Sequence, residues 1–210
     1  MDNHQIEQIY YNLGEPVCSK FAGCFLADRL PQKFELDQFY VLNTIPSSQS
    51  EPGHWVVYFG SERGGLSGAT KDSTTDNQGA LYFDSFGNIP DNPDLIRKSL
   101  DIQDRIFYNN FSLQSIFSNS CAIHCLLVSF LWAQGLSMSE ILTRVYNTRT
   151  RNELENDVIA YQSLKKIYDR RTLGADHRRW EALIPVSAFI TSGPRSDLAH
   201  SHTIFSRLFS

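Results

Sequence analysis

The sequence is poor in cysteine and has no long hydrophobic run. Its four cysteines, at positions 18, 24, 121 and 125, are not a disulfide framework, and nothing in their spacing demands pairing. The most apolar stretch, residues 122–133, covers 12 positions, whereas a helix needs about 20 to span a bilayer. The first residues lack a basic region followed by an apolar run, so we expect no signal peptide. We therefore expect an intracellular, reducing compartment, where a cysteine stays a free thiol.

Composition and charge place the chain among ordinary globular proteins. Of its 210 residues, 41% are hydrophobic, 20% are charged and 12% are aromatic, which excludes a disordered or collagen-like chain. The charge is uneven: residues 1–140 carry 8 Lys and Arg against 16 Asp and Glu, whereas residues 141–210 carry 11 against 7. The basic C-terminal third is either a solvated helix face or a surface that contacts an acidic partner.

Short apolar runs predict several helices and strands before residue 112. Apolar residues at helical spacing predict a helix over residues 6–13 that ends at Gly14, and Asn92 is the expected cap of a helix over residues 90–100. β-branched and aromatic residues predict strands over residues 39–42, 54–59, 80–83 and 105–111. Residues 21–30 are also apolar, but we expect a loop there.

Two kinds of helix are expected in the second half of the chain. Residues 122–133 are apolar on nearly every face, which predicts a helix surrounded by protein. After residue 139 the predicted helices are amphipathic, and their expected inner positions are Ile141, Val145, Val158, Leu164 and Ile167. The chain therefore divides into a core of residues 1–138 and a C-terminal helical extension of residues 139–210, which we expect to pack on the core.

Cys121 stands at the start of the predicted buried helix. Ser118, Asn119 and Ser120 precede it, and the side-chain oxygens of such residues accept the unpaired N–H groups of a first helical turn. A helix N-terminus also favours the thiolate, the form of cysteine that attacks a carbonyl. From these features alone, a nucleophile and a small buried side chain are equally good interpretations. Cys125, one turn later, is assigned to packing.

His54 and Asp84 both stand at predicted strand ends. His54 opens a strand after the turn residues Pro52 and Gly53, where an imidazole can reach a cleft. Asp84 closes the next strand, and a carboxylate there can accept an imidazole N–H and fix the tautomer of the ring. A structural histidine and an aspartate in a turn are the ordinary alternatives.

Gln114 precedes Cys121 by seven residues. Its side-chain amide can donate a hydrogen bond to the oxyanion formed in acyl transfer, together with the backbone N–H of Cys121. A surface glutamine at a strand end is the alternative. The order along the chain is then a histidine before Trp55, an aspartate at the next strand end, a glutamine, and a cysteine at the start of an apolar helix.

This order of motifs resembles the adenovirus-type cysteine proteases (adenains), within the larger clan that includes the SUMO- and ubiquitin-like-protein proteases. The segments that carry the resemblance are GHWV (53–56), LYFDSFG (81–87) and LQSIFSNSC (113–121), and it covers roughly residues 5–135. The resemblance implies a base, its acidic partner, an oxyanion donor and a nucleophile: His54, Asp84, Gln114 and Cys121.

The resemblance also implies a fold and a substrate class. The fold is α+β, with helices flanking a mixed central sheet; it is the circularly rearranged papain-like fold, with the nucleophile at the N-terminus of a buried central helix. The activity is that of a viral or virus-like cysteine endopeptidase, which cleaves capsid or core precursor proteins in the host nucleus and the virion. Its substrates would carry Gly-Gly or Gly-X before the scissile bond, because a tunnel bordered by Gly53 and Trp55 admits only glycine.

Departures from the family bear on activation. Ala122 follows the nucleophile where the family usually has glycine, and Asp84 follows the wider clan where adenovirus enzymes can have glutamate. Those enzymes link to an activating peptide through a cysteine about eighteen residues before the nucleophile, a position that Gln103 occupies here. A peptide activator would therefore not be disulfide-linked. DNA is the other implied activator; the net charge is −4, so weak DNA binding would depend on the basic C-terminal third.

Four other functions are open to the sequence. A deconjugating protease for ubiquitin-like modifiers would use the same catalytic residues, whereas a catalytically silent binding module would have a broken triad. A zinc site from Cys121, His124 and Cys125 is disfavoured, because ligands within one helical turn point around the helix; we expect His124 to pack against a strand or to edge the cleft. Nucleic-acid binding would use basic pairs that are scattered among acids: Lys165-Lys166, Arg170-Arg171 and Arg178-Arg179.

Overall fold

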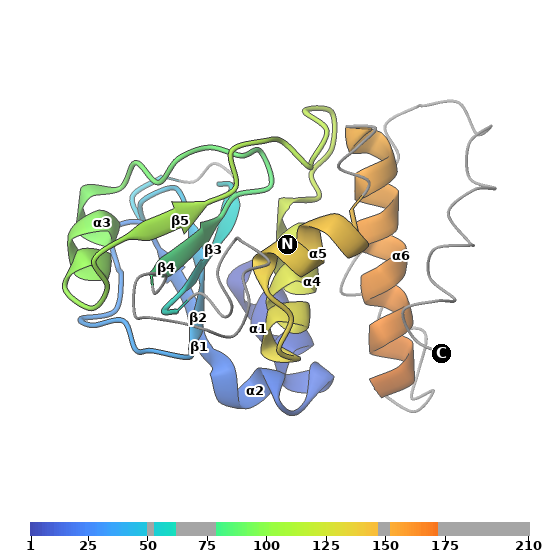
Figure 1. Cartoon of the computed structure of the whole chain (residues 1–210), viewed down its shortest axis with the longest axis horizontal. Helices are drawn as coiled ribbons and strands as arrows, with labels where there is room; N and C mark the ends of the chain where they lie inside the picture. The colour runs from blue at the N-terminus through green and yellow to red at the C-terminus, as the bar shows by residue number, and fades with distance from the viewer. Residues whose placement is uncertain (50–52, 62–78, 147–151, 172–210) are drawn as a thin grey trace, which may run out of the picture.

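Five strands form one mixed sheet at the centre of the chain (Figure 1). The computed structural model describes residues 1–49, 53–61, 79–146 and 152–171. The strands lie in the order β1-β2-β3-β4-β5 and span Phe21–Leu26, Phe39–Asn43, Trp55–Phe59, Ala80–Phe83 and Ile106–Tyr108. The outer pairs, β1–β2 and β4–β5, are parallel, and the pairs that involve β3 are antiparallel.

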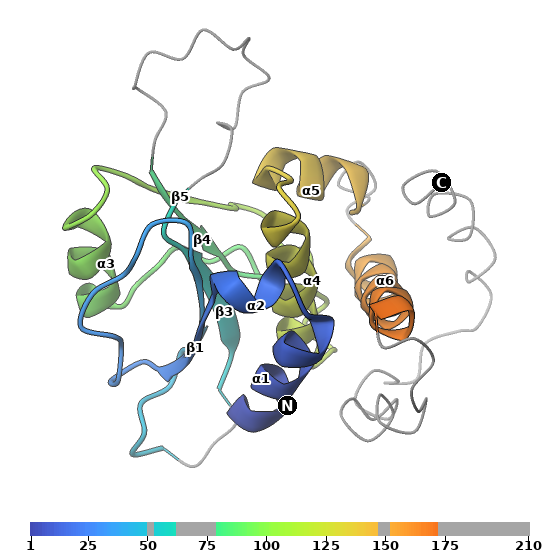
Figure 2. The ribbon, with the colours of Figure 1, turned by 90° about the horizontal axis from the view of Figure 1, so that it is seen from below.

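Helices cover both faces of this sheet (Figure 2). The described residues form α1 (Asn3–Leu13), α2 (Val17–Lys20), α3 (Pro93–Leu100), α4 (Cys121–Ala133), α5 (Met138–Arg144) and α6 (Glu153–Arg171). α3 lies on one face, α1 and α4 lie on the other, and α6 lies beyond α4. The fold is therefore α+β, with a mixed sheet flanked by helices, as predicted.

The strands bury both of their faces because both faces are covered by helices. Successive side chains of a strand point to opposite sides. On β3, Trp55, Val57 and Phe59 join the core beneath α1 and α4, whereas Val56 and Tyr58 join the smaller core beneath α3. Every residue of β2, β3 and β4 is buried. This double burial explains why these strands read as continuous apolar runs.

α4 is the central helix of the larger core. All of its residues from Ala122 to Ala133 are buried, which confirms the prediction of a helix surrounded by protein. It packs against β3 on one side and against α5 and α6 on the other. No helix in the part of the chain that the structure describes is long and apolar enough to cross a membrane.

Several local predictions are confirmed. α1 buries Ile6, Ile9, Tyr10 and Leu13 and ends at Gly14. α3 is capped as expected, because Asn92 Oδ1 accepts from the backbone N–H groups of Asp94 at 3.0 Å and Leu95 at 3.1 Å. Ile141 and Val145, and Leu164 and Ile167 of α6, lie inside.

Other local predictions are wrong. Residues 21–26 form the parallel edge strand β1 rather than a loop, and the register of this strand shifts between Phe21 and Gly23. The sequence shows no alternation of polar and apolar residues that would have indicated a strand here. The strand predicted over 105–111 is limited to Ile106–Tyr108. Val158 is only half-buried, because the inward face of α6 includes the polar Asn156 and Asp157.

The C-terminal helices share the core of α4. Ile141 of α5 and Leu164 of α6 belong to the same cluster of buried residues as Leu127. The boundary at residue 138 stays a prediction. Residues 172–210, and with them the Arg178-Arg179 pair, lie outside the described residues.

Candidate active site

The antiparallel pairing of β3 with β4 brings His54 and Asp84 together. Val57 of β3 pairs with Phe83 of β4, so the residue before β3 and the residue after β4 lie at the same end of the sheet. His54 Nε2 lies 2.7 Å from Asp84 Oδ1. The histidine side chain is 19% exposed and the carboxylate only 3%. The pair thus presents an accessible imidazole backed by a buried acid.

Neighbouring groups hold Asp84 in a fixed orientation. Its Oδ1 also accepts from the backbone N–H of Phe86 at 2.7 Å, and its Oδ2 accepts from the Asn88 side-chain amide at 3.1 Å. Asn109, which follows β5, grips the backbone of Asp84: its Oδ1 accepts from the Asp84 N–H at 3.0 Å and its Nδ2 donates to the Asp84 carbonyl at 2.6 Å. The carboxylate therefore has little freedom to turn away from the imidazole.

Helix α4 places Cys121 beside the same imidazole. Cys125 Sγ donates to the Trp55 carbonyl at 3.2 Å, which fixes α4 against the start of β3. Cys121 lies four residues earlier, about one turn, and so on the same helix face. Its thiol lies close enough to the ring of His54, the residue before Trp55, to raise the pKa of the imidazole. Cys125 is buried, and it also sets the position of the predicted nucleophile.

The neighbours of His54 decide its protonation. Burial alone lowers the pKa of the imidazole, because desolvation disfavours its charged form. The hydrogen bonds with Asp84 and Cys121, and the negative charges of these groups, outweigh burial and raise the pKa to about 9. Since Nε2 contacts Asp84, Nδ1 is the nitrogen left to face the thiol. The ring of Phe86 lies over the imidazole, with 4.8 Å between centroids.

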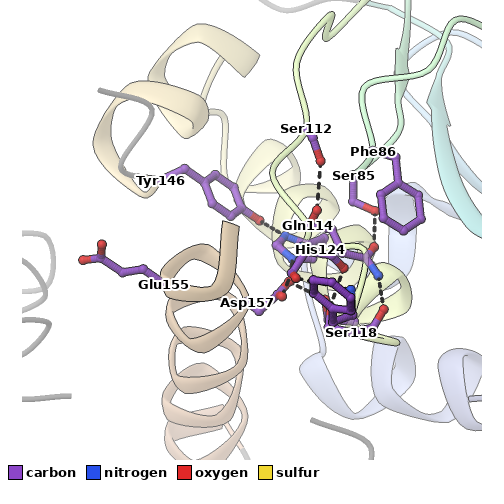
Figure 3. A network of polar contacts seen from close by, with 12 residues as sticks. Ser85, Phe86, Ser112, Gln114, Ser118, His124, Tyr146, Glu155 and Asp157 are labelled. Atoms are coloured by element: carbon purple, nitrogen blue, oxygen red, sulfur yellow. Dashed lines mark hydrogen bonds and ion pairs between the residues drawn. The ribbon is translucent and has the colours of Figure 1, made fainter. Parts of the chain in front are cut away.

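Gln114 lies close to this site but is only 1% exposed. Its Oε1 accepts from Ser85 Oγ at 2.6 Å, and its Nε2 donates to the Ser118 carbonyl at 2.8 Å (Figure 3). The backbone N–H of Gln114 donates to the Ser85 carbonyl at 3.0 Å. A primary amide carries two N–H groups, and an oxyanion would need the second. The role of Gln114 as an oxyanion donor stays a prediction.

The start of α4 differs from the prediction of a serine cap. Ser120 occupies the N-cap position, but its side chain accepts no hydrogen bond from the first turn. Its Oγ instead donates to Asp157 Oδ1 at 2.5 Å. The prediction is wrong: the hydrogen bond to Asp157 orients the hydroxyl, and Ser120 has φ −91° and ψ 4°, outside the extended conformation of a capping serine. The backbone N–H groups of Cys121 and Ala122 therefore receive no cap from this side chain, whereas the N–H of Ile123 donates to the Ser120 carbonyl at 2.9 Å.

His124 lies in the core, so the prediction that it edges the cleft is wrong; the alternative, that it packs against a strand, stays a prediction. Its side chain is fully buried; Nε2 lies 2.8 Å from Asp157 Oδ1, and Nδ1 lies 3.0 Å from the Tyr146 hydroxyl. Both ring nitrogens are thus engaged, one by Asp157 of α6 and the other by Tyr146, two residues after the end of α5. A search of the described ranges finds no group of side chains that could hold a metal ion.

The two residues predicted to contact substrate serve the local architecture. Trp55 is 4% exposed, and its indole N–H donates to the Met1 carbonyl at 3.2 Å. Gly53 packs against Asn43, because a Cβ at this position would lie 1.8 Å from Asn43 Oδ1. Only glycine therefore fits at the turn that leads into His54. Contact of Gly53 and Trp55 with substrate stays a prediction.

Sequence reasoning missed Asn109 and Asp157. Asn109 follows a short strand, and Asp157 occupies one polar position among many on α6. Nothing local distinguishes either residue, because their partners lie 25 and 37 positions away.

A scan of the chain against models of protein families finds no match, and a search of curated proteins finds no similar sequence.

Proposed function

We propose that the chain is a cysteine endopeptidase, with Cys121 as nucleophile, His54 as general base and Asp84 as the carboxylate that orients the base. The observation that carries this proposal is one imidazole whose Nε2 lies 2.7 Å from a carboxylate oxygen and whose pKa is also raised by a neighbouring thiol. A pKa of about 9 makes the imidazole basic enough to take the proton of a thiol, which ordinarily titrates near ~8.5. The thiolate is the attacking form.

The reaction proceeds by acyl transfer to sulfur. Cys121 Sγ attacks the carbonyl carbon of the peptide, and the carbonyl electron pair moves to oxygen. The N–H groups at the start of α4, with Gln114, stabilise this oxyanion. The imidazolium of His54 donates its proton to the amine as the C–N bond breaks, which leaves a thioester. Water gives a proton to His54, attacks the thioester, and releases the carboxylic acid and the thiol.

The resemblance to adenains supports a substrate class within this proposal. Substrates are precursor proteins of a virus or virus-like particle, cut after small residues such as Gly-Gly or Gly-X, with Gly53 and Trp55 bordering the substrate. The circularly rearranged papain-like fold, the activation by DNA or by a peptide that is not disulfide-linked, and the location in host nucleus and virion belong to the same proposal. The alternative substrate class is proteins conjugated to ubiquitin-like modifiers, which end in Gly-Gly.

A cleavage profile tests the proposal. Purified wild-type chain, Cys121→Ala and the control Cys18→Ala are incubated with a peptide library containing Gly-Gly and Gly-X sites, with and without DNA. Wild type and Cys18→Ala should cleave after small residues, and Cys121→Ala should not. Cleavage that survives in Cys121→Ala would sink the proposal. Strong labelling of Cys121 by a ubiquitin or SUMO vinyl sulfone would favour deconjugation over precursor processing.

A further inference from the structure

A buried carboxylate on α6, that of Asp157, contacts α4 and the segment that precedes it. Asp157 is 6% exposed. Its Oδ2 accepts from the backbone N–H of Ser115 at 3.2 Å, and its Oδ1 accepts from Ser120 Oγ at 2.5 Å and lies 2.8 Å from His124 Nε2. Figure 3 shows Asp157 with His124 beside the segment that carries Gln114 and Ser118. Removing a carboxylate from water is unfavourable unless hydrogen bonds replace its hydration, and here they do.

Two of the three contacts of Asp157 fall at the two ends of one segment, residues 115–120. Ser115 directly follows Gln114, the predicted oxyanion donor, and Ser120 directly precedes Cys121, the proposed nucleophile. One side chain therefore ties together the two places from which an oxyanion would receive its hydrogen bonds.

Hydrogen bonds continue from this carboxylate to Gln114. Ser118 Oγ lies 2.8 Å from Ser120 Oγ, and the Ser118 carbonyl accepts from Gln114 Nε2 at 2.8 Å. Side-chain burial does little to fix the middle of the segment, because Ile116 is 74% exposed and Phe117 is 70% exposed. Polar contacts therefore define its shape: a turn in which the Ser118 N–H donates to the Ser115 carbonyl at 3.0 Å, and the contacts with Asp157 that hold the two ends of that turn.

Asp157 is itself held in place from the opposite side. Burial raises the pKa of Tyr146 well above its usual value, so the phenol keeps its proton and can donate to His124 Nδ1. The tautomer that satisfies both contacts then carries its proton on Nε2 and donates to Asp157. None of these residues contacts the His54–Asp84 pair in the interactions described above.

We propose that Asp157 is a positioning residue: it clamps residues 115–120 so that Gln114 and the first N–H groups of α4 converge on the point where the substrate oxyanion forms. This inference rests on the proposed protease function. It predicts a division of labour in which His54 and Asp84 prepare the thiolate, and Asp157 shapes the oxyanion site without touching substrate.

Two thiol reagents separate these roles in Asp157→Asn. Iodoacetamide alkylates sulfur by displacing iodide and forms no oxyanion, whereas a Gly-Gly peptide aldehyde adds the thiolate to its carbonyl and needs oxyanion stabilisation. The alkylation rate of Cys121 should stay within about 2-fold of wild type. Aldehyde affinity and kcat for peptide cleavage should each fall by about 10²-fold with KM little changed, because misplacement of about 1 Å can have that effect.

Matched variants control for loss of structure. Glu153→Gln removes an acid from the same helix and should leave the alkylation rate of Cys121, the affinity for the aldehyde and kcat unchanged. Ser120→Ala deletes one hydroxyl but keeps the Asp157–His124 contact, so it tests the clamp if Asp157→Asn fails to fold; it should weaken aldehyde binding more than alkylation. If Asp157→Asn and Ser120→Ala lowered the alkylation rate and the affinity for the aldehyde by equal factors, the proposal would be overturned.

Amide hydrogen exchange over residues 115–121 tests the clamp without any assay of activity. Faster exchange there in Asp157→Asn, with α1 and β3 unchanged, is the expected result; wild-type exchange over the segment would overturn the proposal. If the wild-type chain neither cleaves peptides nor binds the aldehyde, the protease function has failed, and the exchange measurement alone still decides whether Asp157 holds the segment.

Discussion

The molecule contains two histidine–aspartate pairs with nearly the same geometry and opposite surroundings. Nε2 lies 2.7 Å from the carboxylate in His54–Asp84 and 2.8 Å in His124–Asp157. The side chain of His54 is 19% exposed and has a thiol as its neighbour besides Asp84. The side chain of His124 is fully buried and has a phenol as its partner besides Asp157. A short contact between imidazole and carboxylate therefore does not mark a site by itself. Solvent access and a neighbouring thiol distinguish the two pairs.

The proposed site at the first pair should lose nearly all peptide cleavage when Cys121 or His54 is replaced. We expect Cys121→Ala and His54→Ala to lower kcat/KM by roughly 10⁴–10⁶-fold while the fold is kept, because the members of such a site act as a unit. Peptide cleavage and far-UV circular dichroism check the two halves of this statement. The comparison would break if His54→Ala retained most of its activity.

Asp84→Asn should come next in size. An amide can present its N–H to the imidazole and favour the wrong tautomer, so we expect activity to fall by roughly 10²–10⁴-fold. The pKa of His54 should also fall from about 9 toward its ordinary value of 6.5, because Asp84 is a main cause of its rise. NMR titration of the imidazole checks this shift. An unchanged titration would mean that Asp84 does not govern the ring.

Gln114→Ala should have a smaller effect. If its amide donates to the oxyanion, the rate should fall by about 10²–10³-fold with KM little changed. Steady-state kinetics on the preferred peptide measure this change, and Gln114→Glu, which keeps the size of the side chain, serves as the companion variant. A Gln114→Ala enzyme at full speed would remove this residue from the mechanism.

The pH dependence of stability should report the raised pKa of His54. Its folded-state pKa of about 9 exceeds its ordinary value of 6.5, so the folded chain holds this proton more strongly than the unfolded chain. This contribution is fully present below about pH 6.5 and is lost as pH rises through about 9. Urea unfolding should therefore show a larger loss of stability in His54→Gln at about pH 6 than at about pH 9.5. Equal losses would contradict the shift.

The second pair should matter for stability more than for the thiol. Tyr146→Phe removes the hydroxyl that contacts His124 Nδ1. We expect it to lower the free energy of unfolding by about 1–3 kcal/mol, because a buried ring nitrogen loses its partner. The alkylation rate of Cys121 should stay at the wild-type level. Urea unfolding and iodoacetamide kinetics measure the two quantities, and a strongly slowed alkylation would erase the distinction between the pairs.

The sequence predicts the parts of the molecule whose causes are local. Ala80–Phe83 and Trp55–Phe59 were recognisable as strands because their aromatic and β-branched side chains leave few other structures open. Asn92 was recognisable as a cap because capping involves only the next three residues. His54 and Asp84 could be paired because they stand at the ends of consecutive strands.

Long-range polar contacts could not be predicted in the same way. The position of Ser120 before an apolar helix is typical of a capping residue, but its hydroxyl donates a hydrogen bond to a carboxylate 37 residues later in the chain. Asp157 looks like an exposed residue of an amphipathic helix, and only the packing of α6 on α4 turns it inward. Every residue of β1 is half-buried, so polar and apolar side chains do not alternate along residues 21–26. Only the pairing of β1 with β2 identifies this segment as a strand.

Alkylation of the cysteines by iodoacetamide at neutral pH tests the central claim, that His54 activates Cys121, most directly. Burial raises the pKa of Cys18, Cys24 and Cys125, so these thiols serve as slow references within the same molecule. The account predicts that Cys121 reacts fastest in the wild-type chain and at least about 10-fold slower in His54→Ala, as peptide mass spectrometry would measure. Equal rates at Cys121 in the two proteins would contradict it.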